Sequence, residues 1–159
     1  MAQSVREMTV VGTRIRIEET IAAPPERVWA AIEDISSHVR WMDDAVAIRF
    51  TSEARSGVGA SFDCDTKVGP FRLTDRMVVT EWDPPRALGI RHAGIVTGAG
   101  RFALAPTGAG TSFAWEEELR FPAWAGGRAG GAAAAPMLRR MWRRNLANLK
   151  SLVEGGAEV

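Results

Sequence analysis

Apolar and polar side chains alternate with a period of two over most of this chain, a pattern that predicts β-strands. The first such stretch covers about residues 10–21, where Ile15 and Ile17 alternate with charged side chains. Turn sequences such as SGVG, KVGP, DPPR, GIVTG and PTGAGT separate the later stretches. Six further strands are therefore expected near residues 45–51, 58–67, 71–82, 87–94, 98–105 and 111–121. Their short spacing favours sequential antiparallel hairpins.

Helical spacing replaces this alternation in two parts of the chain. In APPERVWAAIEDISSHVRWM the prolines Pro24 and Pro25 suit the beginning of a helix, and a second short helix is expected at about residues 36–41. MLRRMWRRNLANLKSLVE predicts a long amphipathic closing helix, with Pro136 either kinking it or marking its start. Its inward stripe consists of Leu138, Met141, Trp142, Asn145, Leu149 and Leu152.

A glycine-rich segment, FPAWAGGRAGGAAAAP, precedes the closing helix. Four glycines, Gly126, Gly127, Gly130 and Gly131, fall within six residues. Because glycine loses more conformational entropy on ordering than any other residue, the segment is expected to be a mobile lid.

The order of the elements limits the architecture to an α+β fold. A seven-stranded antiparallel sheet with one apolar face needs a cover, which the C-terminal helix can supply. We therefore expect the sheet to curl around that helix, with two short helices between the first and second strands. The whole chain, residues 1–159, is expected to form a single domain with an ordered core at about residues 10–154.

Composition and charge exclude several classes of function. The net charge of +1 provides no overall field for nucleic acid or an anionic membrane. A single cysteine, Cys64, excludes an internal disulfide, and no stretch has the length of a signal peptide or membrane span, so a cytoplasmic location is expected. Motifs for metal or phosphate binding are absent, and the sequence predicts no metal and no cofactor.

The chain resembles the START-like helix-grip superfamily, and within it the SRPBCC or polyketide cyclase/dehydrase branch. The resemblance is carried by IAAPPERVWAAIEDI, KVGPFRLTDRMVVTEWDPPRALGIRH, TGAGRFALAPTGAGTSFAWEEELRF and LRRMWRRNLANLKSLVE. It implies a helix-grip fold with a cavity for a hydrophobic small molecule between the sheet and the long helix. It does not imply one chemistry, because proteins with this fold perform unrelated functions.

Three ionisable side chains share the phase of the apolar, inward positions: Asp75, His92 and Glu117. A buried carboxylate without a partner is costly, so these groups must meet each other, water or a ligand. They are the candidate catalytic residues. The alternative is that the strand register slips, leaving each of them in solvent or paired with an arginine.

The same phase argument predicts the residues that line the cavity. Trp41 and Trp124 are added because they lie at the end of the second helix and in the lid. The predicted lining comprises Trp41, Phe71, Leu73, Asp75, Met77, Ile90, His92, Phe113, Trp115, Glu117, Trp124, Leu138, Met141 and Asn145. Cys64 is expected to be a buried, inert thiol, because alternation places it opposite Asp63 and Asp65.

Three functions from different classes remain. The first is a carrier or sensor that binds a hydrophobic small molecule, such as a polyketide, a lipid or an isoprenoid-like compound. The second is a cyclase or dehydratase that uses the polar groups as acid and base. The third is a protein-interaction module. Neither nucleic-acid binding nor membrane insertion is expected, and a homodimer is left open.

Overall fold

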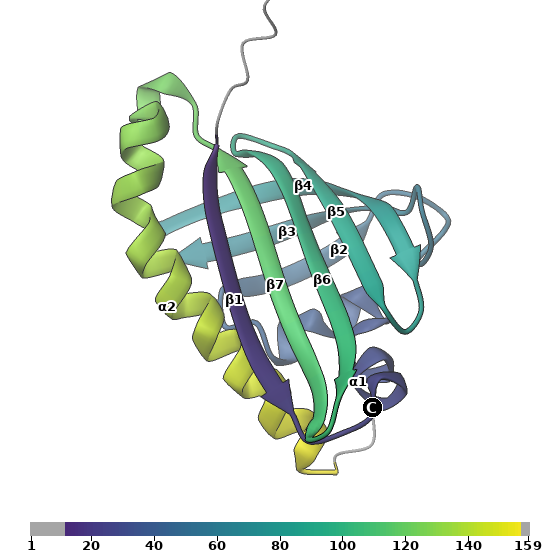
Figure 1. The fold of residues 1–159 in the computed structure, drawn as a ribbon. Helices are drawn as coiled ribbons and strands as arrows, with labels where there is room; N and C mark the ends of the chain where they lie inside the picture. Colours follow the sequence, from purple (N-terminus) through teal and green to yellow (C-terminus); the bar gives the residue numbers. More distant parts are fainter. Residues whose placement is uncertain (1–11, 157–159) are drawn as a thin grey trace, which may run out of the picture.

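A computed structural model describes residues 12–156 and shows a curved antiparallel sheet with a long helix (Figure 1). The elements in chain order are β1 (Thr13–Ile21), α1 (Pro25–Ile32), η1 (Ile35–Arg40), β2 (Ala45–Phe50), β3 (Ser61–Val68), β4 (Phe71–Asp83), β5 (Ala87–Ala93), β6 (Thr97–Thr107), β7 (Gly110–Arg120), η2 (Ala123–Ala125) and α2 (Gly127–Glu154). The expected α+β architecture is confirmed. Residues 10 and 11 of the expected first strand, and the chain ends at 1–9 and 157–159, lie outside the described part.

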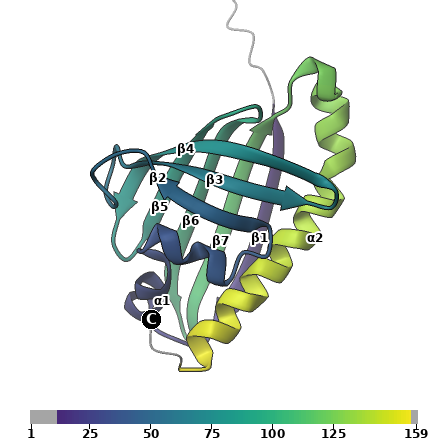
Figure 2. The ribbon, with the colours of Figure 1, turned by 180° about the vertical axis from the view of Figure 1, so that it is seen from behind.

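The strands form one sheet in the order β1-β7-β6-β5-β4-β3-β2. Strands β2 to β7 pair consecutively as antiparallel hairpins, as the turn spacing predicts. The last strand, β7, also pairs with the first strand, β1, which forms the edge of the sheet opposite β2. Seen from behind, β2, β3 and β4 cross in front of the other strands (Figure 2), so the sheet folds over on itself.

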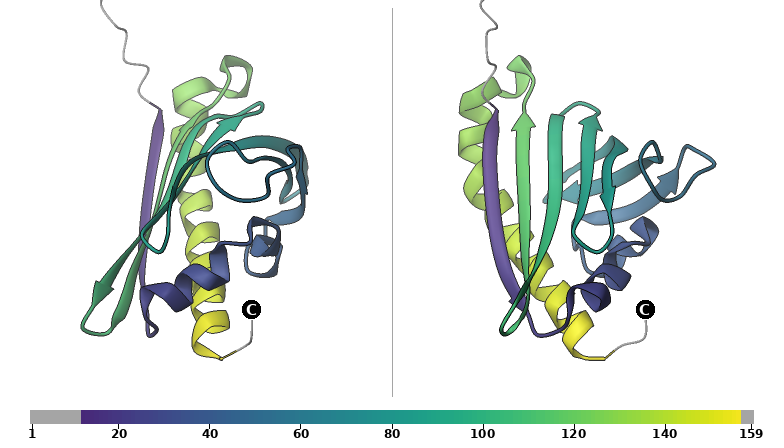
Figure 3. Two further views of the ribbon diagram at one scale, coloured as in Figure 1. Left: turned by 90° about the vertical axis from the view of Figure 1, so that its right-hand side faces the viewer. Right: turned by 45° about the vertical axis from the view of Figure 1, so that its right-hand side comes forward.

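The curvature of the sheet creates its concave side. Register shifts occur between Ala45 and Ala47 in β2 and between Val79 and Glu81 in β4, and such bulges bend a strand. Side views show the long helix α2 running along the open side of this curved sheet (Figure 3). The short helices α1 and η1 close its lower end.

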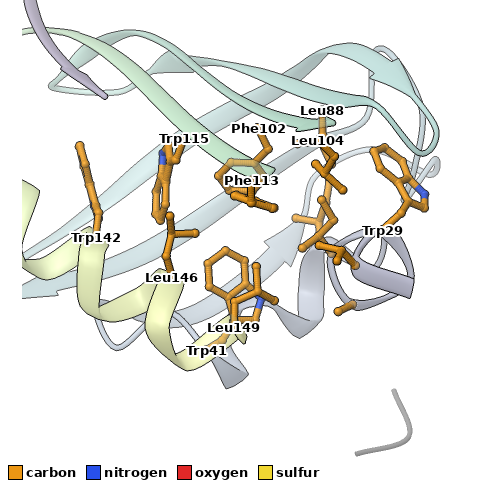
Figure 4. Close-up of a cluster of buried hydrophobic side chains, with 14 of the residues drawn as sticks. Trp29, Trp41, Leu88, Phe102, Leu104, Phe113, Trp115, Trp142, Leu146 and Leu149 are labelled. Carbon is orange, nitrogen blue, oxygen red and sulfur yellow. The ribbon is translucent and has the colours of Figure 1, made fainter. Parts of the chain in front are cut away.

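A dense aromatic cluster fixes α2 to the sheet (Figure 4). Trp142 of α2 stacks on Trp115 of β7, with ring centroids 5.3 Å apart and an interplanar angle of 22°. Trp41 and Phe102 lie edge-on to Trp115, and Phe113 is tilted against Phe102. Burying rings of this size supplies much of the hydrophobic free energy of folding.

The glycine-rich segment is helical, which corrects the expectation of a mobile lid. Helix α2 begins at Gly127, and Pro136 lies inside it rather than at its start. Small residues allow a close approach here, because a side chain at Gly131 would collide with Thr13 and Phe121. Packing against β1 and the end of β7 therefore outweighs the low helix propensity of glycine. The second short helix is a 3-10 helix, η1, whose first turn is capped by Asp34.

Candidate ligand cavity

A cavity of about 590 Å³ lies between the concave face of the sheet and α2. Phe62, Met77 and Ile90 contribute to its sheet side, and Leu138 and Met141 to its helix side. Ligand pockets for small organic molecules typically measure about 300–1,000 Å³. The cavity is therefore large enough for such a molecule.

Exposed apolar side chains surround the mouth of the cavity. Phe71 at the start of β4, Ile95 in the β5–β6 turn, Trp124 in η2 and Met137 in α2 all line the cavity and are all exposed. Trp124 is the most exposed of them, at 79%. Large exposed apolar side chains that gather in one place are typical of a binding or entry site.

Most of the predicted lining residues do line this cavity. They are Phe71, Leu73, Asp75, Met77, Ile90, His92, Trp115, Glu117, Trp124, Leu138 and Met141. The other three are buried elsewhere. Trp41 and Phe113 belong to the packed aromatic core, and Asn145 bonds the loop before β2.

The three inward ionisable side chains meet in the wall of the cavity. Nδ1 of His92 lies 2.6 Å from Oδ2 of Asp75, and its Nε2 lies 3.0 Å from Oε2 of Glu117. All three residues are buried. Each ring nitrogen of His92 thus faces a carboxylate, and we call this group the Asp75–His92–Glu117 triad.

Four adjacent strands position the triad. Asp75 lies on β4, His92 on β5 and Glu117 on β7, while β6 runs between the last two. On its inward face β6 carries Gly98 and Gly100 opposite these neighbours. A Cβ atom at Gly100 would lie 2.7 Å from Cδ of Glu117, so any larger residue here would force this carboxylate to move.

The two carboxylates determine the charge of His92. Burial alone would lower the pKa of this imidazole, but hydrogen bonds to Asp75 and Glu117 and their negative charges raise the pKa to about 10. His92 is therefore an imidazolium at neutral pH and donates both N–H groups. Trp115 adds a third donor, since its indole N–H donates to Oε1 of Glu117 at 2.9 Å.

Sequence reasoning missed a second polar group of the cavity wall, around Asp44. Nδ2 of Asn145 donates to Oδ1 of Asp44 at 2.6 Å, and Oδ1 of Asn145 accepts from the backbone N–H of Asp43 at 3.0 Å. Burial raises the pKa of Asp44. Asp44 lies in the turn between η1 and β2, where no periodicity indicates which way a side chain points. Asn145, by contrast, stands in the apolar stripe of α2.

His38 of η1 also lines the cavity and was not predicted. Its Nε2–H donates to the carbonyl oxygen of Ile32 at 2.7 Å, because a carbonyl can only accept. Burial lowers the pKa of His38 to about 4, so this imidazole is neutral at pH 7.

The remaining candidates behave as alternation predicts. Cys64 is buried and lines the cavity, and burial raises the pKa of its thiol to about 11, which leaves it protonated and unreactive. Asp63 and Asp65 lie on the outer face, where they pair with Arg76 and Arg49. Within residues 12–156 no cluster of three His, Cys, Asp or Glu side chains is arranged to hold a metal ion.

Comparison with known proteins identifies the family of this chain. Residues 12–154 match the family described as polyketide cyclase/dehydrase and lipid transport, and the chain belongs to that family. A search of curated proteins finds no match. In the described part of the chain, no helix combines the length and the apolar character that crossing a membrane requires.

Solved structures share the fold at low sequence identity. TTHA0849 from Thermus thermophilus superposes with a TM-score of 0.75 at 19% identity, over 91% of this chain and 99% of that one. MLL2253 from Mesorhizobium loti gives a TM-score of 0.69 at 18% identity, with the same coverage. The di-domain aromatase/cyclase StfQ of the steffimycin biosynthetic pathway gives 0.76 at 14%, over 94% of this chain and 53% of that one. These likenesses concern the fold alone.

Proposed function

We propose that the protein binds a hydrophobic small molecule in the cavity between the sheet and α2, as a carrier or sensor. The observation that carries this proposal is a cavity of about 590 Å³ with apolar walls and an exposed apolar mouth. Emptying such a space of water and filling it with apolar groups is favourable, because apolar surface leaves water. Membership of a family that includes lipid transport is consistent with this role.

The test is a titration with the neutral fluorophore Nile red, together with native mass spectrometry and organic extraction of gently purified protein. We expect saturable binding by the wild type. The Met141→Trp variant places a larger ring at the helix side of the cavity and should bind at least about tenfold more weakly, since overpacking leaves no room for the dye.

Ala147→Trp is the matched control for this experiment. Ala147 is exposed on the same helix, and it is not one of the residues that line the cavity. Its replacement should leave Nile red binding unchanged. Wild-type protein that carries no extractable ligand and does not bind the dye would contradict the proposal. Equal affinity in all three proteins would contradict it as well.

The triad favours a second candidate function, a cyclase or dehydratase acting on a poly-β-keto chain. His92 is already protonated and both its N–H groups are engaged, so the Asp75 carboxylate is the better base. Asp75 would take the proton from a carbon between two carbonyl groups, and the C–H electron pair would move to form the enolate. The adjacent imidazolium would stabilise the negative charge on the enolate oxygen.

Asp75→Asn tests this enzymatic candidate, because an amide cannot accept the proton. We expect turnover of a synthetic poly-β-keto substrate to fall by about a hundredfold or more, the usual contribution of a positioned base. Asp65→Asn, which changes an exposed carboxylate of the neighbouring strand, is the control. Unchanged turnover in Asp75→Asn would remove Asp75 from the mechanism.

A further inference from the structure

The exposed apolar side chains at the mouth of the cavity continue onto an apolar face of α2. Between Arg128 and Arg139 this helix has no polar side chain, since residues 129–138 are alanine, glycine, proline, methionine and leucine. The exposed members of this stretch are Ala129, Ala132, Ala133, Pro136 and Met137. A helix at the surface of a globular protein ordinarily turns a polar face outward, so this face is unusual. We call these five residues, together with Phe71, Ile95 and Trp124, the mouth patch.

Four basic side chains surround the mouth patch. Lys67 and Arg72 lie on either side of the β3–β4 turn. On α2, Arg128 lies in the first turn and Arg140 follows Met137 by one turn. All four are exposed, and none of them forms an ion pair with another residue of the range 12–156. Their charges are therefore available to an anionic partner.

The acidic residues lie elsewhere. Three segments that border the mouth contain no aspartate or glutamate, namely residues 66–74, 93–100 and 119–142. The carboxylates of the triad are buried in the cavity wall, and the His92 imidazolium lies between them. The net charge of +1 for the whole chain thus conceals a local excess of positive charge beside the mouth patch.

From the apolar surface and the surrounding charges we infer that the mouth patch docks on the surface of an anionic lipid bilayer. Exposed apolar patches of this kind mark sites of interaction with proteins or membranes. A bilayer is favoured here because aromatic rings settle at the level of the lipid head groups, while lysine and arginine side chains attract anionic lipids. Apolar side chains bordered by basic ones are the pattern of proteins that lie on a membrane surface without crossing it.

The position of the mouth patch suits such docking. The first turns of α2 lie at the end of the molecule opposite α1 (Figure 1), where a flat surface can approach them. Trp124 and Phe71 are 79% and 71% exposed, and both also line the cavity. A hydrophobic ligand that leaves the bilayer at this point enters the cavity without crossing water. The inference goes beyond the proposed binding function, since docking itself does not require a bound ligand.

Co-sedimentation with lipid vesicles at low ionic strength tests the inference. We expect the wild type to bind vesicles of phosphatidylcholine with about one third phosphatidylglycerol, and to bind pure phosphatidylcholine vesicles at least about tenfold more weakly. Added salt should weaken binding to the anionic vesicles, because it screens exposed charges.

Two variants assign the contact to the mouth patch. The double variant Lys67→Glu, Arg128→Glu should bind anionic vesicles at least about twentyfold more weakly, since each basic residue near such a surface contributes about fivefold. Neither side chain lines the cavity, so the double variant should still bind Nile red. Trp124→Ala removes the most exposed aromatic ring and should weaken vesicle binding by about tenfold.

Arg40→Glu and Val58→Ala are the matched controls. Arg40 is exposed at the end of η1, and Val58 is 68% exposed in the loop between β2 and β3. Neither residue lines the cavity. Both variants should bind the anionic vesicles as the wild type does.

The outcomes separate docking from ligand binding. If the wild type binds Nile red but not the anionic vesicles, the inference is overturned and the proposed function stands. If it binds the vesicles but not the dye, the inference stands and the proposed function fails. Equal vesicle binding by the double variant and by Arg40→Glu overturns the inference, because the contact would then lie elsewhere on the protein.

Sedimentation velocity without vesicles tests whether a second copy of the chain covers the mouth patch instead. We expect the wild type and Trp124→Ala to sediment alike. A wild-type dimer that Trp124→Ala converts into a monomer would identify a second copy as the partner and would overturn docking on a bilayer.

Discussion

The two histidines of the chain line the same cavity and are both buried, yet their surroundings shift their pKa values in opposite directions. His38 faces one backbone carbonyl, and its pKa falls to about 4. His92 lies between two carboxylates, and its pKa rises to about 10. Burial lowers the pKa in both cases, so the partners decide the charge. The same cavity is therefore lined by one neutral and one charged imidazole.

The largest expected effect comes from His92→Leu, which leaves two carboxylates facing each other without the imidazolium. Breaking a buried charge cluster in this way should lower the free energy of unfolding by about 3–5 kcal/mol. The contribution of His92 is fully present below pH 6.5, its ordinary pKa, and is lost as the pH rises through about 10. Urea unfolding at pH 6 and pH 10 measures both quantities.

Glu116→Gln is a matched control for the change at His92. Glu116 is exposed and adjoins Glu117 in β7, and its loss should barely alter the unfolding midpoint. A loss below about 1 kcal/mol in His92→Leu would show that the triad is not a stabilising cluster.

A smaller effect is expected for His38→Leu, which removes the neutral imidazole. This change leaves the carbonyl of Ile32 without its donor and should cost about 1–3 kcal/mol. The pH dependence has the opposite sign. Because the folded pKa lies below 6.5, the contribution of His38 is present above pH 6.5 and is lost as the pH falls through about 4.

Urea unfolding between pH 4 and pH 7 checks this prediction. On acidification from pH 7 to pH 4, the free energy of unfolding should fall more in the wild type than in His38→Leu. Parallel curves for the two proteins over this range would mean that His38 is not held neutral in the folded state.

The smallest effect is expected for Asp65→Asn, on the outer face of the sheet. Asp65 and Arg49 form two hydrogen bonds, at 2.6 Å and 2.9 Å, and these lower the pKa of Asp65 to about 2. The pair is exposed to solvent, which screens the attraction. We expect no resolvable change in the urea midpoint. A loss of stability comparable to that of His92→Leu would mean that the hydrogen-bond geometry of the Arg49–Asp65 pair outweighs its exposure to solvent.

The strands and the consecutive pairing of β2 to β7 were predictable from the sequence because alternation and turn chemistry are local properties. The pairing of β1 with β7 was not predicted, because it joins segments far apart in the sequence. The beginning of α2 was not. Its first turns contain Gly127, Gly130 and Gly131, which have low helix propensity, and they are stabilised by close packing against Thr13 and Phe121. Contacts between residues this far apart leave no local pattern.

The candidate site was predictable in part. Alternation identified Asp75, His92 and Glu117 as inward, but their meeting depends on strand pairing and on the glycines of β6. The inward phase also cannot distinguish a cavity wall from a packed core, so it places Phe113 at the cavity, although Phe113 belongs to the packed core.

Gly98 and Gly100 leave the inward face of β6 without side chains between His92 on β5 and Glu117 on β7. A single methyl group at Gly100 would push the Glu117 carboxylate aside, since its Cβ would lie 2.7 Å from Cδ of Glu117. A substitution at Gly100 would therefore reshape this wall of the cavity while leaving Asp75, His92 and Glu117 themselves unchanged in sequence.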